Sequence, residues 1–208
     1  MTQRDIVNKA SSQVGYHEKK TNTPTNYLYQ FQNSYDGSDN WTKYHHDLSV
    51  GQGVAWCGYF CYWVFYQLLG QSFLNTDNFL HGISGRGGGV NAWESAFSSA
   101  GYYFPKGSYV PSPGDVVIFS SNDYTWSHCE IVADVTEWPN YIMTVGGNTT
   151  NPNEGGDQSQ GLWVASRRRS VTASSGFWIR GFCAIDSQVG PSTGWLIVKR
   201  RRIGTAFG

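Results

Sequence analysis

The feature that most constrains the fold of this chain is the order of its two hydrophobic patterns. Apolar residues recur at helical spacing in the first half, in the segments 2–14, 41–48, 55–69 and 91–101. Beyond these, short β-rich runs separated by turn residues occupy 112–121, 127–135, 141–148, 161–170 and 177–185. Because helices precede strands instead of alternating with them, the sequence predicts an α+β domain, with N-terminal helices packed on a central antiparallel β-sheet.

Length and composition limit the classes of function. The 208 residues are enough for one domain with a sizeable core. Fifteen Lys and Arg residues balance fifteen Asp and Glu residues, so the chain lacks the basic surplus that favours nucleic-acid binding. Aromatic residues make up 16% of the chain, which suits a groove that binds sugars or peptides as well as a core. No segment reaches the roughly 18 apolar residues of a membrane helix.

The segment 55–69 is apolar nearly all round, so a helix here is buried on most sides. It follows the glycine-bearing turn GQGVAW, and Cys57 stands where the helix begins. A thiol at a helix N-terminus faces the positive end of the helix dipole, which favours the thiolate. Cys61 lies one turn further in, where a thiol is usually an inert buried side chain. Position therefore makes Cys57 the better candidate nucleophile, although the plain interpretation is that both cysteines are structural.

The cysteines exclude two other classes of site. The chain has four cysteines in 208 residues, Cys57, Cys61, Cys129 and Cys183, which is too few for a disulfide scaffold. The pair at 57 and 61 has neither a second C-x-x-C nor a histidine cluster at zinc spacing. The metal interpretation of this pair is therefore weak.

A cysteine nucleophile needs a base, and the run SHCEIV places His128 at the start of an expected strand. The next run ends in VGGN, which offers Asn148 as the third group that holds the imidazole in the right tautomer. Glu130 is a second candidate for that role, because residues i and i+2 of a strand share a face. Each residue alone has a plain structural explanation, and it is their order with Cys57 that indicates a catalytic site.

The ordered motifs resemble a CHAP domain (cysteine, histidine-dependent amidohydrolase/peptidase), in the papain-like group of bacterial and phage cell-wall hydrolases. The matching pieces are AWCGYFCYW, NAWESAFSSAGYYF, PSPGDVVIF, SHCEIV and VGGNTT. The opening VNKASSQVGYHEK and the late GLWVASRRRS also look like phage endolysins that carry this domain. The resemblance covers residues 2–187, so we expect a catalytic domain over 1–188 and a basic tail or extra edge strand over 189–208. It implies a papain-like fold, with Cys57 as nucleophile and His128 as general base.

One position departs from the family pattern. Such domains often read E-G-N at the third strand, with the glutamate helping to orient the histidine. This chain has Gly146 at the glutamate position, while Asn148 matches. The resemblance therefore implies that Asn148 orients the imidazole alone, as an amide does in papain-like proteases.

The resemblance also implies a substrate cleft that runs past the aromatic residues Trp56, Tyr59 and Trp126. No cofactor is expected to be required. Some relatives carry calcium upstream of the nucleophile, and Asp36 and Asp39 in DGSDN are the comparable cluster. The same letters also spell an ordinary turn, so calcium is a weak prediction here.

Two runs of basic residues need an explanation of their own. The three arginines 167–169 fall in an expected strand, where neighbours point to opposite faces, so at least one is expected to pair or stack. The cluster 199–202 is most simply a solvated tail. If it has a function, attraction to anionic wall polymers is more plausible than nucleic-acid binding.

The implied function is hydrolysis of an amide bond in bacterial peptidoglycan, by an N-acetylmuramoyl-L-alanine amidase or a stem or cross-bridge endopeptidase. The N-terminus lacks the apolar region of a signal peptide. We therefore expect synthesis in the cytoplasm and action on the wall after holin-type release, as for a phage endolysin, or after dedicated export. Membrane insertion is not expected. Two alternatives stay open: a wall-binding module that has lost catalysis, and a toxin-like cysteine hydrolase with a non-wall substrate.

Overall fold

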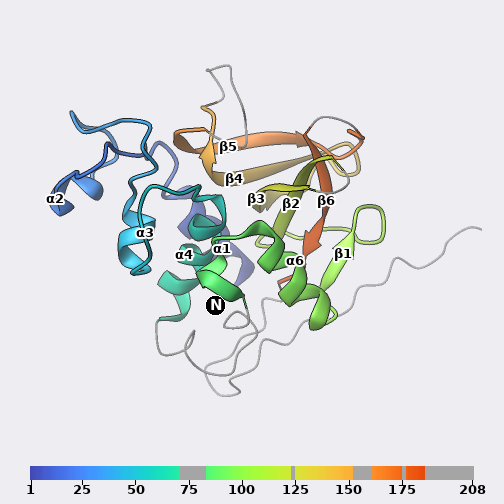
Figure 1. The fold of residues 1–208 in the computed structure, drawn as a ribbon. Helices are drawn as coiled ribbons and strands as arrows, with labels where there is room; N and C mark the ends of the chain where they lie inside the picture. The colour runs from blue at the N-terminus through green and yellow to red at the C-terminus, as the bar shows by residue number, and fades with distance from the viewer. Residues whose placement is uncertain (71–82, 123–124, 152–160, 175–176, 186–208) are drawn as a thin grey trace, which may run out of the picture.

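The computed structural model describes residues 1–70, 83–122, 125–151, 161–174 and 177–185 (Figure 1). The tail 189–208, with its predicted edge strand and basic cluster, lies outside the described residues, as does the side chain of Trp126. The described helices are α1 (Gln3–Ser11), α2 (Thr25–Leu28), α3 (Lys43–Asp47), α4 (Cys57–Leu69), η2 (Ser84–Gly87, a 3-10 helix) and α6 (Val90–Ser99). The strands are β1 (Tyr103–Pro105), β2 (Val116–Asn122), β3 (Thr125–Asp134), β4 (Tyr141–Thr149), β5 (Trp163–Ser170) and β6 (Trp178–Cys183).

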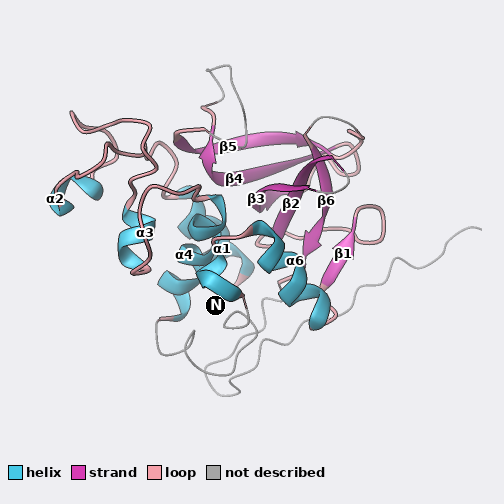
Figure 2. Cartoon of the chain, viewed as in Figure 1, coloured by secondary structure: helices cyan, strands magenta, loops and turns pink. Residues whose placement is uncertain are grey.

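The strands form one six-stranded sheet in the order β1-β6-β2-β3-β4-β5, and each neighbouring pair is antiparallel. Consecutive strands β2 to β5 lie side by side, and β6 returns to pair with β2. Figure 2 shows the helices gathered on one side of this sheet. The α+β prediction is confirmed, and the arrangement is papain-like.

The predicted helices and strands are all present, with ends that differ by a few residues. Three short elements, α2, η2 and β1, were not predicted from the sequence pattern. Strand β1 is three residues long and pairs with β6 through Tyr103 and Cys183. A segment this short carries too little periodicity to be recognised, and its pairing with β6 is a tertiary contact.

Helix α4 is the buried centre of the molecule, and glycines let the backbone approach it closely from two sides. A Cβ on Gly147 of β4 would lie 2.7 Å from the Cβ of Phe60. A Cβ on Gly58 would lie 2.0 Å from the carbonyl oxygen of Gly87 in η2. Both distances are shorter than real Cβ contacts, so a side chain at either glycine would push these elements apart. The N-terminal turn of α4 is thereby fixed between the sheet and η2.

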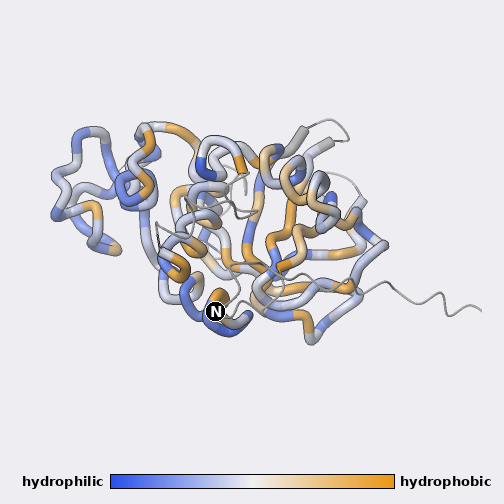
Figure 3. Tube along the Cα trace, turned by 90° about the horizontal axis from the view of Figure 1, so that it is seen from below, coloured by the Kyte–Doolittle hydropathy of each residue, from blue (hydrophilic) through white to orange (hydrophobic). Residues whose placement is uncertain are grey.

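The two faces of the sheet bury different side chains. Cys129 and Ile131 of β3 belong to the cluster shared with α4, whereas Val132 belongs to a second cluster with Phe119 and Phe182. This alternation is the two-residue period of a strand. Figure 3 shows hydrophobic stretches through the central helices and strands, and hydrophilic stretches in the loops around α2. Among the described residues, no helix combines the length and the apolar character needed to cross a membrane.

Candidate active site

Cys57 is the first residue of α4, as the sequence predicted. Its side chain is 4% exposed. The preceding residue, Trp56 (φ −124°, ψ 12°), makes no side-chain cap hydrogen bond, so no cap side chain covers this helix end. The first N–H groups of a helix have no partner within it, and together with the helix dipole they favour negative charge at that end. The sulfur therefore lies where a thiolate or a developing oxyanion is stabilised.

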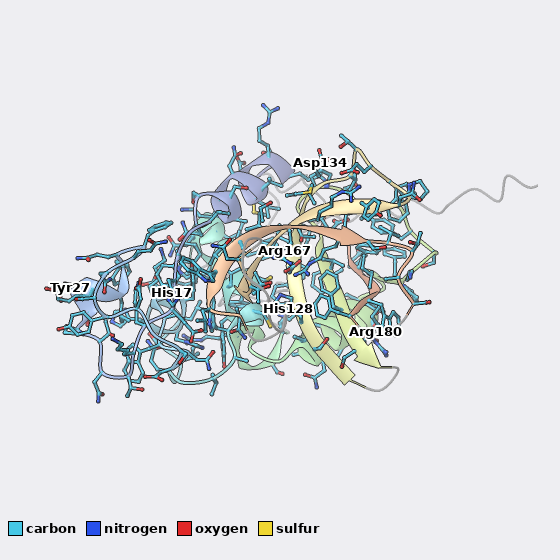
Figure 4. The ribbon with its side chains drawn as sticks, turned by 90° about the horizontal axis from the view of Figure 1, so that it is seen from above. His17, Tyr27, His128, Asp134, Arg167 and Arg180 are labelled. Atoms are coloured by element: carbon cyan, nitrogen blue, oxygen red, sulfur yellow. The ribbon has the colours of Figure 1, made fainter. Side chains whose placement is uncertain are left out.

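His128 of β3 lies close enough to this sulfur for the two groups to shift each other's pKa. Figure 4 shows His128 in the middle of the molecule. The ring is fully buried, and its Nε2 lies 3.1 Å from Oε1 of Glu130. The other ring nitrogen, Nδ1, has no hydrogen-bond partner. Since Glu130 accepts from Nε2, Nδ1 is the nitrogen left to exchange a proton with Cys57.

The electrostatics of the pair agree with this assignment. Burial acts to lower the pKa of His128, but the neighbouring Cys57 and Glu130 outweigh it and raise that pKa to about 9. The thiol of Cys129 and burial both raise the pKa of Cys57, while His128 acts in the opposite direction. Cys57 and Glu130 therefore make His128 a stronger base than a free imidazole, while Cys129 and burial favour the protonated thiol of Cys57.

Glu130 is held ionised on the same face of β3. Burial alone would raise the pKa of this carboxyl group, but the guanidinium of Arg169 outweighs burial and lowers it well below its usual value. Nε of Arg169 donates to Oε2 of Glu130 over 2.8 Å, and its Nη2 donates to Oε1. The hydroxyl of Thr144 also donates to Oε2, over 2.6 Å. The carboxylate is thus bonded by β3, β4 and β5 at once.

That Asn148 orients the imidazole stays a prediction, whereas Glu130, the second candidate for that role, lies at hydrogen-bond distance from the ring. Asn148 is buried and has a positive φ of 55°, at an irregularity of the β4–β5 pairing between Gly146 and Thr149. A left-handed residue leaves the regular alternation of a strand, so strand position does not tell where its side chain points. Glu130 remains in regular alternation with His128 and therefore shares its face.

Two of the predicted cleft residues, Trp56 and Tyr59, differ in exposure. Trp56 is fully buried, and its indole Nε1 donates to Glu18 over 2.6 Å while its ring stacks on Tyr44. The prediction that Trp56 lines a cleft is therefore wrong, and the residue instead anchors the start of α4. Tyr59 is partly exposed and packs against the ring of His45, with centroids 4.8 Å apart.

The aspartates considered for calcium do not fit a metal site. Oδ1 of Asp36 pairs with the ammonium of Lys19 at 2.5 Å, and Oδ2 of Asp39 accepts from the backbone N–H of Thr21 at 2.8 Å. A lysine cation thus already neutralises one of the two carboxylates. In the part of the chain that the structure describes, no group of three or more His, Cys, Asp or Glu side chains could hold a metal.

The structure adds two functional neighbours that sequence reasoning missed, Cys129 and Arg169. Cys129 points to the helix side of β3, and its sulfur lies 3.9 Å from that of Cys61. Of the three arginines, Arg168 faces outward, pairs with Glu137 and stacks on Tyr141 at 3.4 Å, while Arg169 points inward. The expectation that at least one arginine pairs or stacks is confirmed. Strand alternation alone predicts that Arg168 and Arg169 point to opposite faces, but it does not tell which of the two points inward.

Accessibility distinguishes the four thiols and leads to a prediction. Cys61, Cys129 and Cys183 are fully buried, so we expect iodoacetamide to label Cys57 first in the folded protein. Peptide mass spectrometry after a time course would measure the order, and labelling in urea would show that all four thiols react once unfolded. Preferential labelling of Cys61 would contradict this choice of sulfur.

A cysteine at the start of a buried helix, next to a histidine on an antiparallel sheet, defines a papain-like cysteine–histidine site. Residues 49–148 match the family model described as CHAP domain. This segment of the chain is therefore a CHAP domain, and it contains both Cys57 and His128. A search of curated proteins and a search of solved structures each found no match. The match implies amidohydrolase or peptidase activity on peptidoglycan-like substrates.

Proposed function

We propose that this protein hydrolyses an amide bond of bacterial peptidoglycan with Cys57 as nucleophile and His128 as general base. The observation that carries the proposal is the state of His128: its Nε2 is taken by Glu130, and its buried Nδ1 is unpaired beside Cys57. In its neutral form, this imidazole has Nδ1 available to accept the proton of the Cys57 thiol. The CHAP match supplies the substrate class.

In the proposed reaction, Sγ of Cys57 attacks the amide carbonyl carbon while its proton passes to Nδ1 of His128. The oxyanion that forms is placed to accept from the backbone N–H of Cys57 at the helix start; removing such a donor costs about 2.7–4 kcal/mol of barrier in other enzymes. The C–N bond then breaks, and the amine leaves with the proton from His128. Water attacks the thioester, His128 accepts its proton, and the thiol of Cys57 is restored as the acid departs.

The same proposal includes a biological setting. A bacteriolytic hydrolase of this kind suits a phage endolysin that reaches the wall from inside the cell. Its partner is peptidoglycan, and the basic cluster 199–202 would add attraction to anionic wall polymers.

Digestion of purified cell walls tests the function and separates its two forms. We expect the protein to solubilise the walls, with fragments identified by mass spectrometry. A free lactyl group on muramic acid identifies an amidase, and a new stem or cross-bridge terminus identifies an endopeptidase. Intact walls after incubation with folded protein, together with toxicity only on cytoplasmic expression, would contradict the proposal in favour of a non-wall substrate.

A further inference from the structure

Arg169 lies outside the matched CHAP segment, yet it is bonded to the carboxylate that contacts His128. The residue is 4% exposed, and its guanidinium lies 5.2 Å from the ring centroid of Phe119 and 5.0 Å from that of Phe177. The two rings stack on each other at 4.6 Å. An arginine with its planar fork on a carboxylate and its face against aromatic rings is held rigidly.

The side chain of Glu130 fills the position that a side chain at residue 146 would take. A Cβ on Gly146 would lie 2.5 Å from Oε1 of Glu130 and 2.8 Å from its Cδ. Gly146 is not among the glycines of positive φ, so its backbone does not itself require glycine. What excludes a side chain there is the carboxylate of the neighbouring strand. Glycine at 146 and glutamate at 130 are therefore complementary.

From these contacts we infer that Arg169 is a positioning residue: it holds Glu130, in the space left by Gly146, as the carboxylate that orients His128 toward Cys57. The inference rests on the proposed function for its catalytic meaning. The orienting group, Glu130, then lies on β3, the strand of His128 itself, and Arg169, which holds it, lies on β5. A glutamate at position 146 would instead have supplied the orienting carboxylate from β4.

The charges around Glu130 decide the sign of the expected pH effect. His128 on β3 and Arg169 on β5 are its direct partners, while Arg167 and Cys61 also feel its charge. The ionised Glu130 favours the imidazolium form of His128, so losing that carboxylate lowers the pKa of His128. A rate that falls when the imidazolium of His128 loses its proton then begins to fall at a lower pH.

The test is the double variant E130Q/R169Q, which removes both charges and so leaves neither one buried alone. Its control is R168Q/E137Q, which removes the outward-facing pair that Arg168 of β5 forms with Glu137 in the turn between β3 and β4. The rate of Cys57 alkylation by iodoacetate is measured against pH, alongside wall hydrolysis. The imidazolium of His128 attracts this anion, so the rate falls once His128 loses its proton. We expect the alkaline limb of E130Q/R169Q to move down by about one pH unit or more, and hydrolysis to fall at least about tenfold.

The control variant is expected to keep the wild-type profile in both measurements. A folded E130Q/R169Q variant with the wild-type alkylation profile would overturn the inference. Alkylation needs no wall substrate, so it tests the positioning role of Arg169 independently of wall hydrolysis. Failure of the wild-type protein to digest walls would contradict only the proposed function.

A second variant tests the assignment of the space over Gly146. E130A/G146E moves the carboxylate from β3 to β4, into the same space and within reach of Arg169. We expect E130A/G146E to keep the alkaline limb near that of the wild type, in contrast to E130Q/R169Q. A folded E130A/G146E protein with the shifted profile of E130Q/R169Q would show that the two positions are not interchangeable.

Discussion

Replacing Cys57 with alanine is expected to abolish wall hydrolysis, with a fall in rate of about 10⁴-fold or more. The reason is that the variant has no sulfur to form the thioester, so His128 is left without a nucleophile to activate. The fold is expected to persist, since the change removes one small side chain at a helix start. Release of soluble fragments from purified walls measures the effect, with circular dichroism as the check on folding.

Cys61→Ala is the matched control for this experiment. Its thiol lies one helical turn from Cys57, is fully buried and lies 3.9 Å from the sulfur of Cys129. Truncating it costs packing, so we expect a loss of stability of about 1 kcal/mol with hydrolysis largely retained. Undiminished wall degradation by Cys57→Ala would sink the enzyme proposal and favour a wall-binding module.

Asp115→Ala is expected to lower the free energy of unfolding by about 3 kcal/mol or more. The fully buried carboxylate accepts from the hydroxyl of Tyr109 at 2.9 Å and from the backbone N–H groups of Ser112 and Ile185 at 2.8 Å each. These bonds join the turn before β2 to the chain after β6. Alanine leaves the three donors without their acceptor. Urea unfolding measures the change as a shift in midpoint at constant slope.

Asp134→Ala is the control for that prediction. Its carboxylate also accepts from a backbone N–H and a hydroxyl, both of Thr136, but it lies at the surface. Water replaces the lost bonds there, so we expect a change within about 1 kcal/mol. Equal losses in the two variants would show that the burial of Asp115 does not govern its contribution.

Most of the fold follows from hydrophobic spacing in the sequence. The apolar run before Gly70 predicted a buried helix, and α4 is that helix, beginning at Cys57. The alternation in SHCEIV predicted a strand with His128 near its start, and β3 contains it. These predictions succeeded because helix and strand periods are local properties of the chain. The short strand β1 was missed because its pairing, and not its composition, makes it a strand.

The sequence by itself determined the class of fold, the order of the motifs and the choice of Cys57 over Cys61, since each depends on spacing along one helix or strand. Only the tertiary structure decided which group contacts the imidazole. Glu130 and Arg169 are 39 residues apart, and their pairing depends on the register of three strands and on the space over Gly146. It also showed that the buried Trp56 donates a hydrogen bond to Glu18, 38 residues away. Contacts between distant segments depend on how the elements pack, and no local period encodes that packing.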